Sequence, residues 1–170
     1  DLAIGIGKAA QSALSEAAIN PAEVSLAALS TTLATNALVE GQGEGVALIF
    51  IGFSQGDLDK HGLRDALGND PVLELPGGHN YAGNEVCALD THSIEKWLQE
   101  LDGVSAFAVA SKFATRNPAH ETQAMKLIGE VTGRPVSASY QLSSKLNGPK
   151  RALTAVLNAR LIGMIARLIN

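Results

Sequence analysis

The chain has 170 residues, of which 46% are hydrophobic and 18% charged, and its formal net charge is -4. A chain of this length can bury a hydrophobic core without disulfides or metals, and its composition excludes a disordered protein. Mild acidity and scattered basic residues argue against a nucleic-acid partner. The single cysteine, Cys87, excludes an internal disulfide and favours a cytoplasmic location.

Both ends of the sequence show helical periodicity. Apolar residues recur at spacings of three and four over residues 2–17 and again over residues 152–169. Because both patterns stop within regular structure, we expect a piece of a longer protein, folded as a single α/β domain over residues 1–170. No apolar run is long enough for a transmembrane helix, so we expect no membrane partner.

Strand and helix patterns alternate between the two terminal helices. The predicted strands are residues 24–30, 46–51, 72–75, 104–110 and 136–140, and the predicted helices are residues 32–40, 57–67, 91–101 and 118–131. The runs VALIFI and VSAFAVA are uninterrupted and apolar, which is typical of strands buried on both faces of a parallel sheet. The alternation predicts an α/β fold with a mostly parallel sheet and flanking helices.

The first candidate ligand site lies where the first predicted strand passes into a helix. Its candidate ligand-binding residues are Thr31, Thr32, Thr35 and Asn36. In open α/β sheets, ligands bind beyond the carboxyl ends of strands, and a helix N-terminus there offers free N–H groups. The same residues also fit a structural role, in which a hydroxyl caps the helix and a buried Asn satisfies the backbone.

A second candidate follows the predicted strand 72–75. Gly77 and Gly78 permit positive φ and a close approach of the backbone to a ligand, and His79 can exchange a proton near neutral pH. The alternative is a turn that carries an exposed histidine.

Other motifs favour structure over chemistry. Asn117, Pro118 and Glu121 fit the cap, first turn and positive end of a helix. The four histidines and Cys87 show no metal-ligand spacing, so we expect no metal site. The segment Gly5-Ile6-Gly7-Lys8 has no preceding strand and no following Ser or Thr, as a phosphate loop would require. The sequence therefore shows no cofactor site of its own and identifies no catalytic residue.

Several segments together resemble the N-terminal region of hydantoinase A and 5-oxoprolinase proteins. The resemblance rests on Ser-Thr-Thr-Leu-Ala-Thr-Asn at 30–36, on Gly-Val-Ala-Leu-Ile at 45–49, on Asn-Pro-Ala-His-Glu at 117–121 and on the final helix around Asn158-Ala159. Leu29 and Ser30 stand where the family usually has His-Gly, so any role of that histidine is in doubt here.

The resemblance implies part of a larger ATP-dependent enzyme that opens cyclic amides of the hydantoin or 5-oxoproline type. It implies ATP and Mg²⁺ as cofactors of the parent protein, and the rest of the parent chain and a second subunit as partners. Related acetone carboxylases act on a ketone, so the resemblance leaves the substrate open. A second interpretation is a non-catalytic α/β domain that docks another subunit or senses a metabolite.

Overall fold

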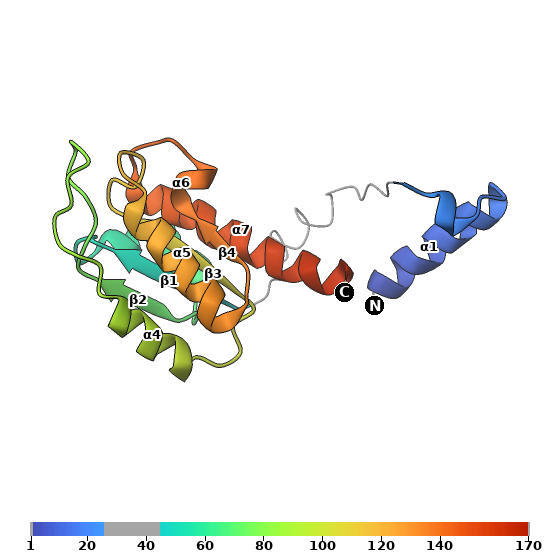
Figure 1. The fold of residues 1–170 in the computed structure, drawn as a ribbon, viewed down its shortest axis with the longest axis horizontal. Coiled ribbons are helices and arrows are strands. Elements are labelled where there is room, and N and C mark those ends of the chain that lie inside the picture. The colour runs from blue at the N-terminus through green and yellow to red at the C-terminus, as the bar shows by residue number, and fades with distance from the viewer. Residues whose placement is uncertain (1, 26–44, 170) are drawn as a thin grey trace.

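A computed structural model describes residues 2–25 and 45–169 (Figure 1). The chain begins with α1 (Leu2–Glu16) and the short helix η1 (Pro21–Glu23). These two helices lie apart from the sheet, and the N-terminal end of α1 lies near the C-terminal end of α7 (Gly148–Ile169). The predicted helix over residues 32–40 and all but the first two residues of the predicted strand 24–30 fall outside the described residues.

The centre of the fold is a four-stranded parallel sheet, which confirms the predicted α/β class. Its strands are β1 (Val46–Ile51), β2 (Val72–Leu75), β3 (Ala106–Ser111) and β4 (Val136–Ala138). They lie in the order β2-β1-β3-β4, and every neighbouring pair is parallel. Ile51 is in register with Leu75 on one side and with Ser111 on the other, so three strands end at the same level.

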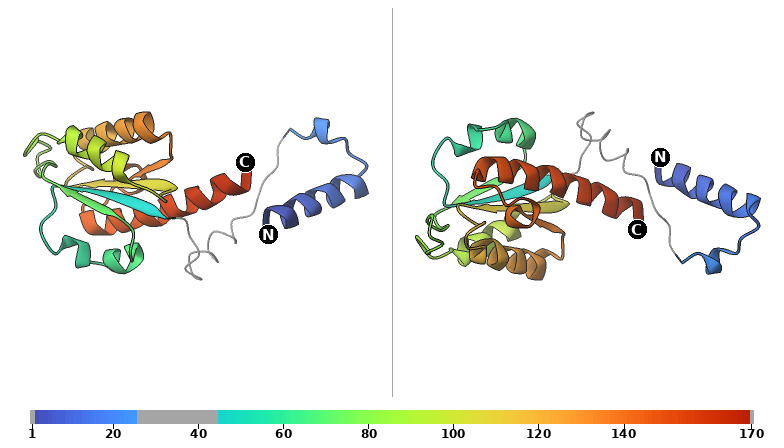
Figure 2. Two further views of the ribbon diagram at one scale, coloured as in Figure 1. Left: turned by 90° about the horizontal axis from the view of Figure 1, so that it is seen from below. Right: turned by 90° about the horizontal axis from the view of Figure 1, so that it is seen from above.

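Helices cover both faces of this sheet (Figure 2). On one face lie α3 (Leu63–Leu67), the short helix η2 (Asp57–Asp59) and the long helix α7. On the other lie α4 (Thr91–Glu100) and α5 (Ala119–Thr132). The short helix α6 (Ser139–Leu142) directly follows β4.

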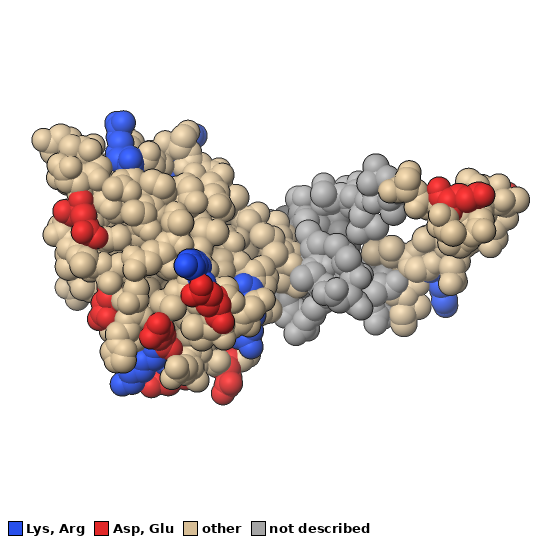
Figure 3. Space-filling model, viewed as in Figure 1, with Lys and Arg blue, Asp and Glu red and all other residues tan. Residues whose placement is uncertain are grey.

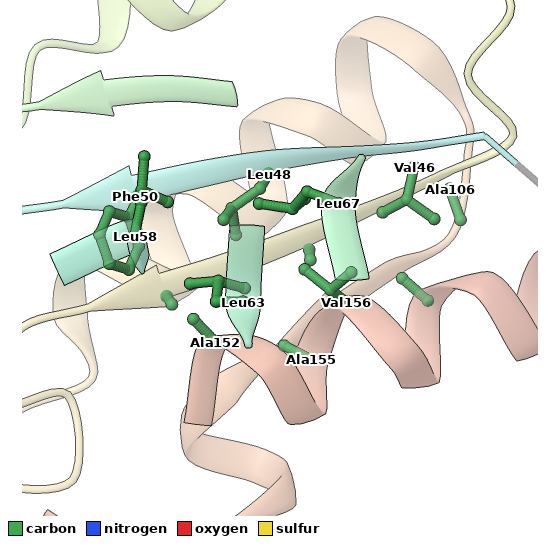
Figure 4. Packing of buried hydrophobic residues seen from close by; sticks show 13 residues of the cluster. Val46, Leu48, Phe50, Leu58, Leu63, Leu67, Ala106, Ala152, Ala155 and Val156 are labelled. Atoms are coloured by element: carbon green, nitrogen blue, oxygen red, sulfur yellow. The ribbon is translucent and has the colours of Figure 1, made fainter. Parts of the chain in front are cut away.

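Alternating side chains of the central strands build two hydrophobic cores. Leu48 and Phe50 of β1 pack toward α3 and α7, where they meet residues such as Leu63 and Val156 (Figure 4). Ile49 of β1 points to the opposite face and joins the core formed with α4 and α5. Successive side chains of a strand point to opposite faces, and both faces are covered here, so every residue of β1 and β3 is buried. This explains why their sequences are uninterrupted apolar runs.

Several predicted boundaries are wrong in detail. The predicted helix 57–67 splits into η2 and α3, because His61 and Gly62 adopt positive φ values of 58° and 74°. The first helix ends at Glu16, before Asn20-Pro21. The last strand ends at Ala138, where α6 begins. The helix α4 ends at Glu100, one residue before its predicted end, and the Asp90 side chain caps its start by accepting the N–H of Ser93 at 3.0 Å.

Within residues 2–25 and 45–169, no helix is long and apolar enough to cross a membrane. On the face shown in Figure 3, the acidic and basic side chains of the described residues are interspersed rather than gathered into one patch.

Candidate functional site

The loops that follow β1, β2 and β3 are joined by backbone hydrogen bonds at the carboxyl edge of the sheet. Gly52 donates its N–H to the Leu75 carbonyl at 2.8 Å, and Lys112 donates to Ile51 at 2.9 Å. His79 in turn donates to the Lys112 carbonyl at 3.0 Å. The structure therefore brings the predicted residues Gly77, Gly78 and His79 to the edge where ligands bind in parallel sheets.

Gly77 and Gly78 have packing reasons for being glycine. Both have positive φ, 141° and 76°. A Cβ on Gly77 would lie 2.8 Å from the Ile51 side chain, and one on Gly78 would lie 3.1 Å from Cβ of Lys112. A larger residue would push this loop off the ends of β1 and β3. Direct contact of the two glycines with a ligand stays a prediction.

His79 is buried, with 2% of its surface exposed, so the alternative of an exposed turn histidine is wrong. Its ring lies 4.6 Å from the ring of His120, at an interplanar angle of 48°. Its Nδ1 atom is buried and has no hydrogen-bond partner among the described residues. Burial lowers the pKa of His79, and the neighbouring His120 lowers it further, while Glu85 opposes the shift.

His120 is held from both sides. Its Nδ1 accepts the N–H of Gly78 at 2.9 Å, and its Nε2 lies 2.7 Å from a carboxylate oxygen of Glu85. Because Nδ1 accepts a hydrogen bond, the ring proton sits on Nε2 and is donated to Glu85. The carboxylate thereby fixes the tautomer and the orientation of the ring. Chemically, this His79–His120–Glu85 cluster offers one oriented imidazole and one imidazole with an unused nitrogen.

Glu121 has a role that the sequence analysis missed. It was assigned to the positive end of a helix, but its side chain is fully buried. One oxygen accepts hydrogen bonds from the Ser111 N–H and the Ser139 hydroxyl, both at 2.7 Å. The other accepts the N–H of Tyr140 at 3.0 Å. Burial raises the pKa of Glu121, and the three donated hydrogen bonds and the charge of Arg151 oppose that shift.

Arg151 completes this network from α7. Only 1% of its surface is exposed, and it donates to the carbonyls of Ser111 at 2.8 Å and Lys145 at 2.9 Å. Its Nε also donates to the Ser139 hydroxyl at 3.3 Å. Burial lowers the pKa of Arg151, and the charge of Glu121 counters that shift. One signal was available in the sequence, because Arg151 interrupts the otherwise apolar buried face of α7.

An open pocket of about 140 Å³ lies beside these clusters, between the segments that follow β1 and β3 and the start of α7. It is lined by Phe53, Asp57, Lys112, Phe113, Leu146, Gly148 and Pro149. A second pocket, of about 180 Å³, is lined by residues of the α6–α7 connection and the first turns of α7.

The other predicted ligand-binding residues, Thr31, Thr32, Thr35 and Asn36, lie outside the described residues. In the part of the chain that is described, no three His, Cys, Asp or Glu side chains come together in a way that could hold a metal ion.

Comparison with known proteins identifies the family. The sequence model of the hydantoinase/oxoprolinase N-terminal region matches residues 1–132. The chain belongs to this family. The comparison with curated proteins gives no match.

Two solved structures share the fold of this family member. The ATP-dependent caprolactamase from Pseudomonas jessenii matches 96% of the chain with a TM-score of 0.70 and 24% identity. The nucleotide-free structure of an acetone carboxylase matches 76% of the chain, with a TM-score of 0.59 and 17% identity. The chain spans 27% of the caprolactamase chain and 22% of the carboxylase chain, so it corresponds to about a quarter of these proteins.

Proposed function

We propose that this chain is the N-terminal region of an ATP-dependent enzyme that hydrolyses a small cyclic amide. The observation that carries the proposal is the family match over residues 1–132. The fold likeness to an ATP-dependent caprolactamase supports the cyclic-amide class over a ketone substrate, because the likeness to the acetone carboxylase is weaker. Hydantoin, 5-oxoproline and larger lactams are the substrates to test. A cytoplasmic location remains part of the proposal.

Neither of the two pockets described above fits ATP, and the described residues show no metal-binding set of side chains for Mg²⁺. The two pockets described above measure about 140 and 180 Å³. Sites for drug-sized ligands usually measure roughly 300–1,000 Å³, so neither pocket can enclose a nucleoside triphosphate. No metal-binding set of side chains is found within residues 2–25 and 45–169. We therefore place nucleotide and metal binding in parts of the parent protein beyond the described residues.

The contribution of this chain, in our proposal, is to orient groups at the carboxyl edge of the sheet. His120 is fixed between Gly78 and Glu85, and His79 stacks on it with a free Nδ1. Such a pair can take up or release a proton at a defined position. The hydroxyls of Thr31, Thr32 and Thr35 and the amide of Asn36 remain candidates for substrate contact.

The test is nucleotide turnover by the parent chain assembled with its second subunit. ADP release is measured with Mg²⁺ and ε-caprolactam, 5-oxoproline or hydantoin, and an open-chain amide serves as the control. We expect ADP release that requires one of the cyclic amides and the appearance of its ring-opened product. ADP release that no cyclic amide stimulates, with the protein folded and assembled, would contradict the proposal.

A docking role is the second candidate, and one observation favours it. Three apolar side chains near the N-terminus are exposed. Ile4 on α1, and Ile19 and Val24 after it, each expose between 43% and 56% of their surface. Large exposed apolar side chains can contribute to a protein interface. One variant of the assembled parent, His79→Phe, distinguishes the two candidate functions. A purely docking chain keeps normal turnover, whereas a chain that supplies the histidine pair loses turnover while assembly is retained.

A further inference from the structure

The pocket next to Phe53 lies at the carboxyl edge of the sheet, beyond the ends of β1 and β3. From β1 the chain crosses to β2 on one side, through η2 and α3. From β3 it crosses to β4 on the other side, through α5 on the opposite face. The two connections diverge, so the carboxyl ends of β1 and β3 form a topological switch point. In open α/β sheets, ligands bind in the crevice at this point.

Close backbone contacts shape the walls of this pocket. Phe53 stacks on Phe50 of the core, with ring centroids 3.8 Å apart. At Gly148 a Cβ would lie 2.2 Å from the Phe53 ring, so only glycine lets the start of α7 approach this wall. Phe113 has a positive φ of 56°, and its carbonyl accepts the N–H groups of Arg116 and Asn117 at 2.8 and 3.2 Å. The aromatic walls are therefore held in place by the backbone.

The polar side of the pocket carries a surplus positive charge. Asp57 accepts hydrogen bonds from Lys60 at 2.7 Å and from the Ser54 N–H at 2.8 Å, so its carboxylate is already balanced. The pKa of Asp57 is lowered mainly by Lys60, then by Ser54, and Lys112 adds a smaller contribution. The side chain of Lys112 is exposed, and apart from its attraction to Asp57 its ammonium group makes no hydrogen bond or ion pair with the described residues. Its ammonium group is free to meet an anion.

We infer that this pocket binds a small organic carboxylate whose apolar body has the size of a single ring. The pocket volume of about 140 Å³ is close to that of a cavity of 150 Å³ that accepts benzene. Phe53, Phe113 and other apolar residues contact the body of the ligand, and Lys112 pairs with its carboxylate. The positive end of the 22-residue helix α7 adds to the attraction.

Other ligands fit less well. Inorganic phosphate would leave the aromatic walls without a partner, and a nucleotide is too large for the pocket. A neutral ring would leave the free ammonium of Lys112 unused.

Binding is tested on the chain itself by two-dimensional ¹H–¹⁵N NMR with sodium benzoate as the probe. We expect shifts that saturate in the millimolar range, as for a fragment-sized ligand, and that centre on the amides of Phe53, Phe113 and Gly148. Lys112→Met should weaken benzoate binding at least five-fold. The control is Lys96→Met, which removes an exposed lysine from α4 on the opposite face and should leave the affinity unchanged.

Neutral benzamide and acetate provide readouts that need no variant. Benzamide lacks the charge of benzoate and should bind at least five-fold more weakly. Acetate lacks the ring and should also bind at least five-fold more weakly than benzoate. Shifts centred elsewhere on the chain, equal binding of benzamide, or benzoate binding that Lys112→Met leaves unchanged would each overturn the inference. Cyclic-amide turnover by the parent is measured in a separate experiment. Failure of benzoate binding would therefore contradict the pocket inference without contradicting the proposed function, and the reverse also holds.

Discussion

Two halves of the same sheet edge differ in how their buried ionisable side chains are hydrogen-bonded. At the β3–β4 half, Glu121 accepts three hydrogen bonds and Arg151 donates three, and Ser139 links the two. At the β1–β2 half, the buried Nδ1 of His79 has no hydrogen-bond partner in the described part of the chain. Both halves lie beyond the carboxyl ends of strands of one parallel sheet.

The difference separates structure from chemistry. Buried ionisable side chains that are hydrogen-bonded at both ends fix the positions of the elements they join, here β3, α5, α6 and α7. A buried ionisable side chain with an unpaired nitrogen costs stability, so its presence calls for another explanation, such as a ligand or a proton to be transferred. We therefore assign stability to the Glu121–Arg151 half and ligand chemistry to the half that contains His79 and the pocket.

Breaking the satisfied half should give the largest effect. Glu121→Ala removes the acceptor of three hydrogen bonds and leaves Arg151 buried without its countercharge. We expect the free energy of unfolding to fall by about 3–5 kcal/mol, measured by chemical denaturation of the chain. Glu130→Ala on the same helix is the control, because Glu130 is exposed and its pairing with Lys126 is a surface contact. A loss at Glu121 no larger than at Glu130 would contradict the structural role.

The backbone of the β1–β2 half is tested by a pair of glycines. Gly52 and Gly56 both have positive φ, 75° and 87°. A Cβ at Gly52 would lie 2.3 Å from the carbonyl oxygen of Gly77, whereas none of the surrounding atoms comes within 4 Å of one at Gly56. Gly56→Ala should cost about 1–2 kcal/mol for the backbone alone. Gly52→Ala should cost about 1–3 kcal/mol more, because the added carbon must displace the Gly77 loop. Equal losses in thermal denaturation would show that this contact does not matter.

Two buried serines sharpen the comparison further. Ser139 donates to Glu121 and accepts from Arg151, whereas the hydroxyl of Ser111 has no partner among the described residues. Ser139→Ala should cost about 1–3 kcal/mol, the usual penalty for unpaired buried partners. Ser111→Ala removes only an unsatisfied hydroxyl and should be neutral or stabilising. A destabilising Ser111→Ala would mean that its hydroxyl has a partner after all.

Much of the fold could be predicted because the buried strands are apolar runs that can be seen directly in the sequence. The runs 46–51 and 72–75 are strands with the predicted boundaries, and residues 106–111 differ from the prediction only at the ends. The errors arise where the boundary of a helix or strand depends on a special backbone conformation or on a contact with a residue far away in the sequence. The predicted helix 57–67 is interrupted by the positive φ of His61, and the last strand ends before Ser139, where α6 begins.

The candidate site could be predicted only in part, for the same reason. The turn that carries His79 is marked by its glycines, but its neighbour His120 lies 41 residues further along the chain. Glu121 looked like a helix-end residue, since its partners Ser139 and Tyr140 lie 18 and 19 residues away. No periodicity or spacing in a single sequence reports such contacts. The pocket is likewise formed by three separate segments.

The smallest effect is expected at His79 and depends on pH. In the folded chain its pKa lies below the ordinary value of 6.5, mainly because the ring is buried and then because His120 is adjacent. Above pH 6.5 both states hold a neutral ring, so its contribution to stability is fully present. As the pH falls below 6.5, the unfolded chain takes up the proton first, so the folded state loses stability.

His79→Phe keeps a ring of similar shape and removes the titration. The unfolding free energy of the wild-type chain should therefore fall more steeply between pH 7.5 and 5.5 than that of the variant, while His120 and Glu85 remain in place. Chemical denaturation at several pH values measures both slopes, and His92→Gln is the control because it removes an exposed histidine. Identical slopes for the wild type and His79→Phe would show that this ring is not held neutral by its surroundings, and would remove the reason for placing proton chemistry at this half of the edge.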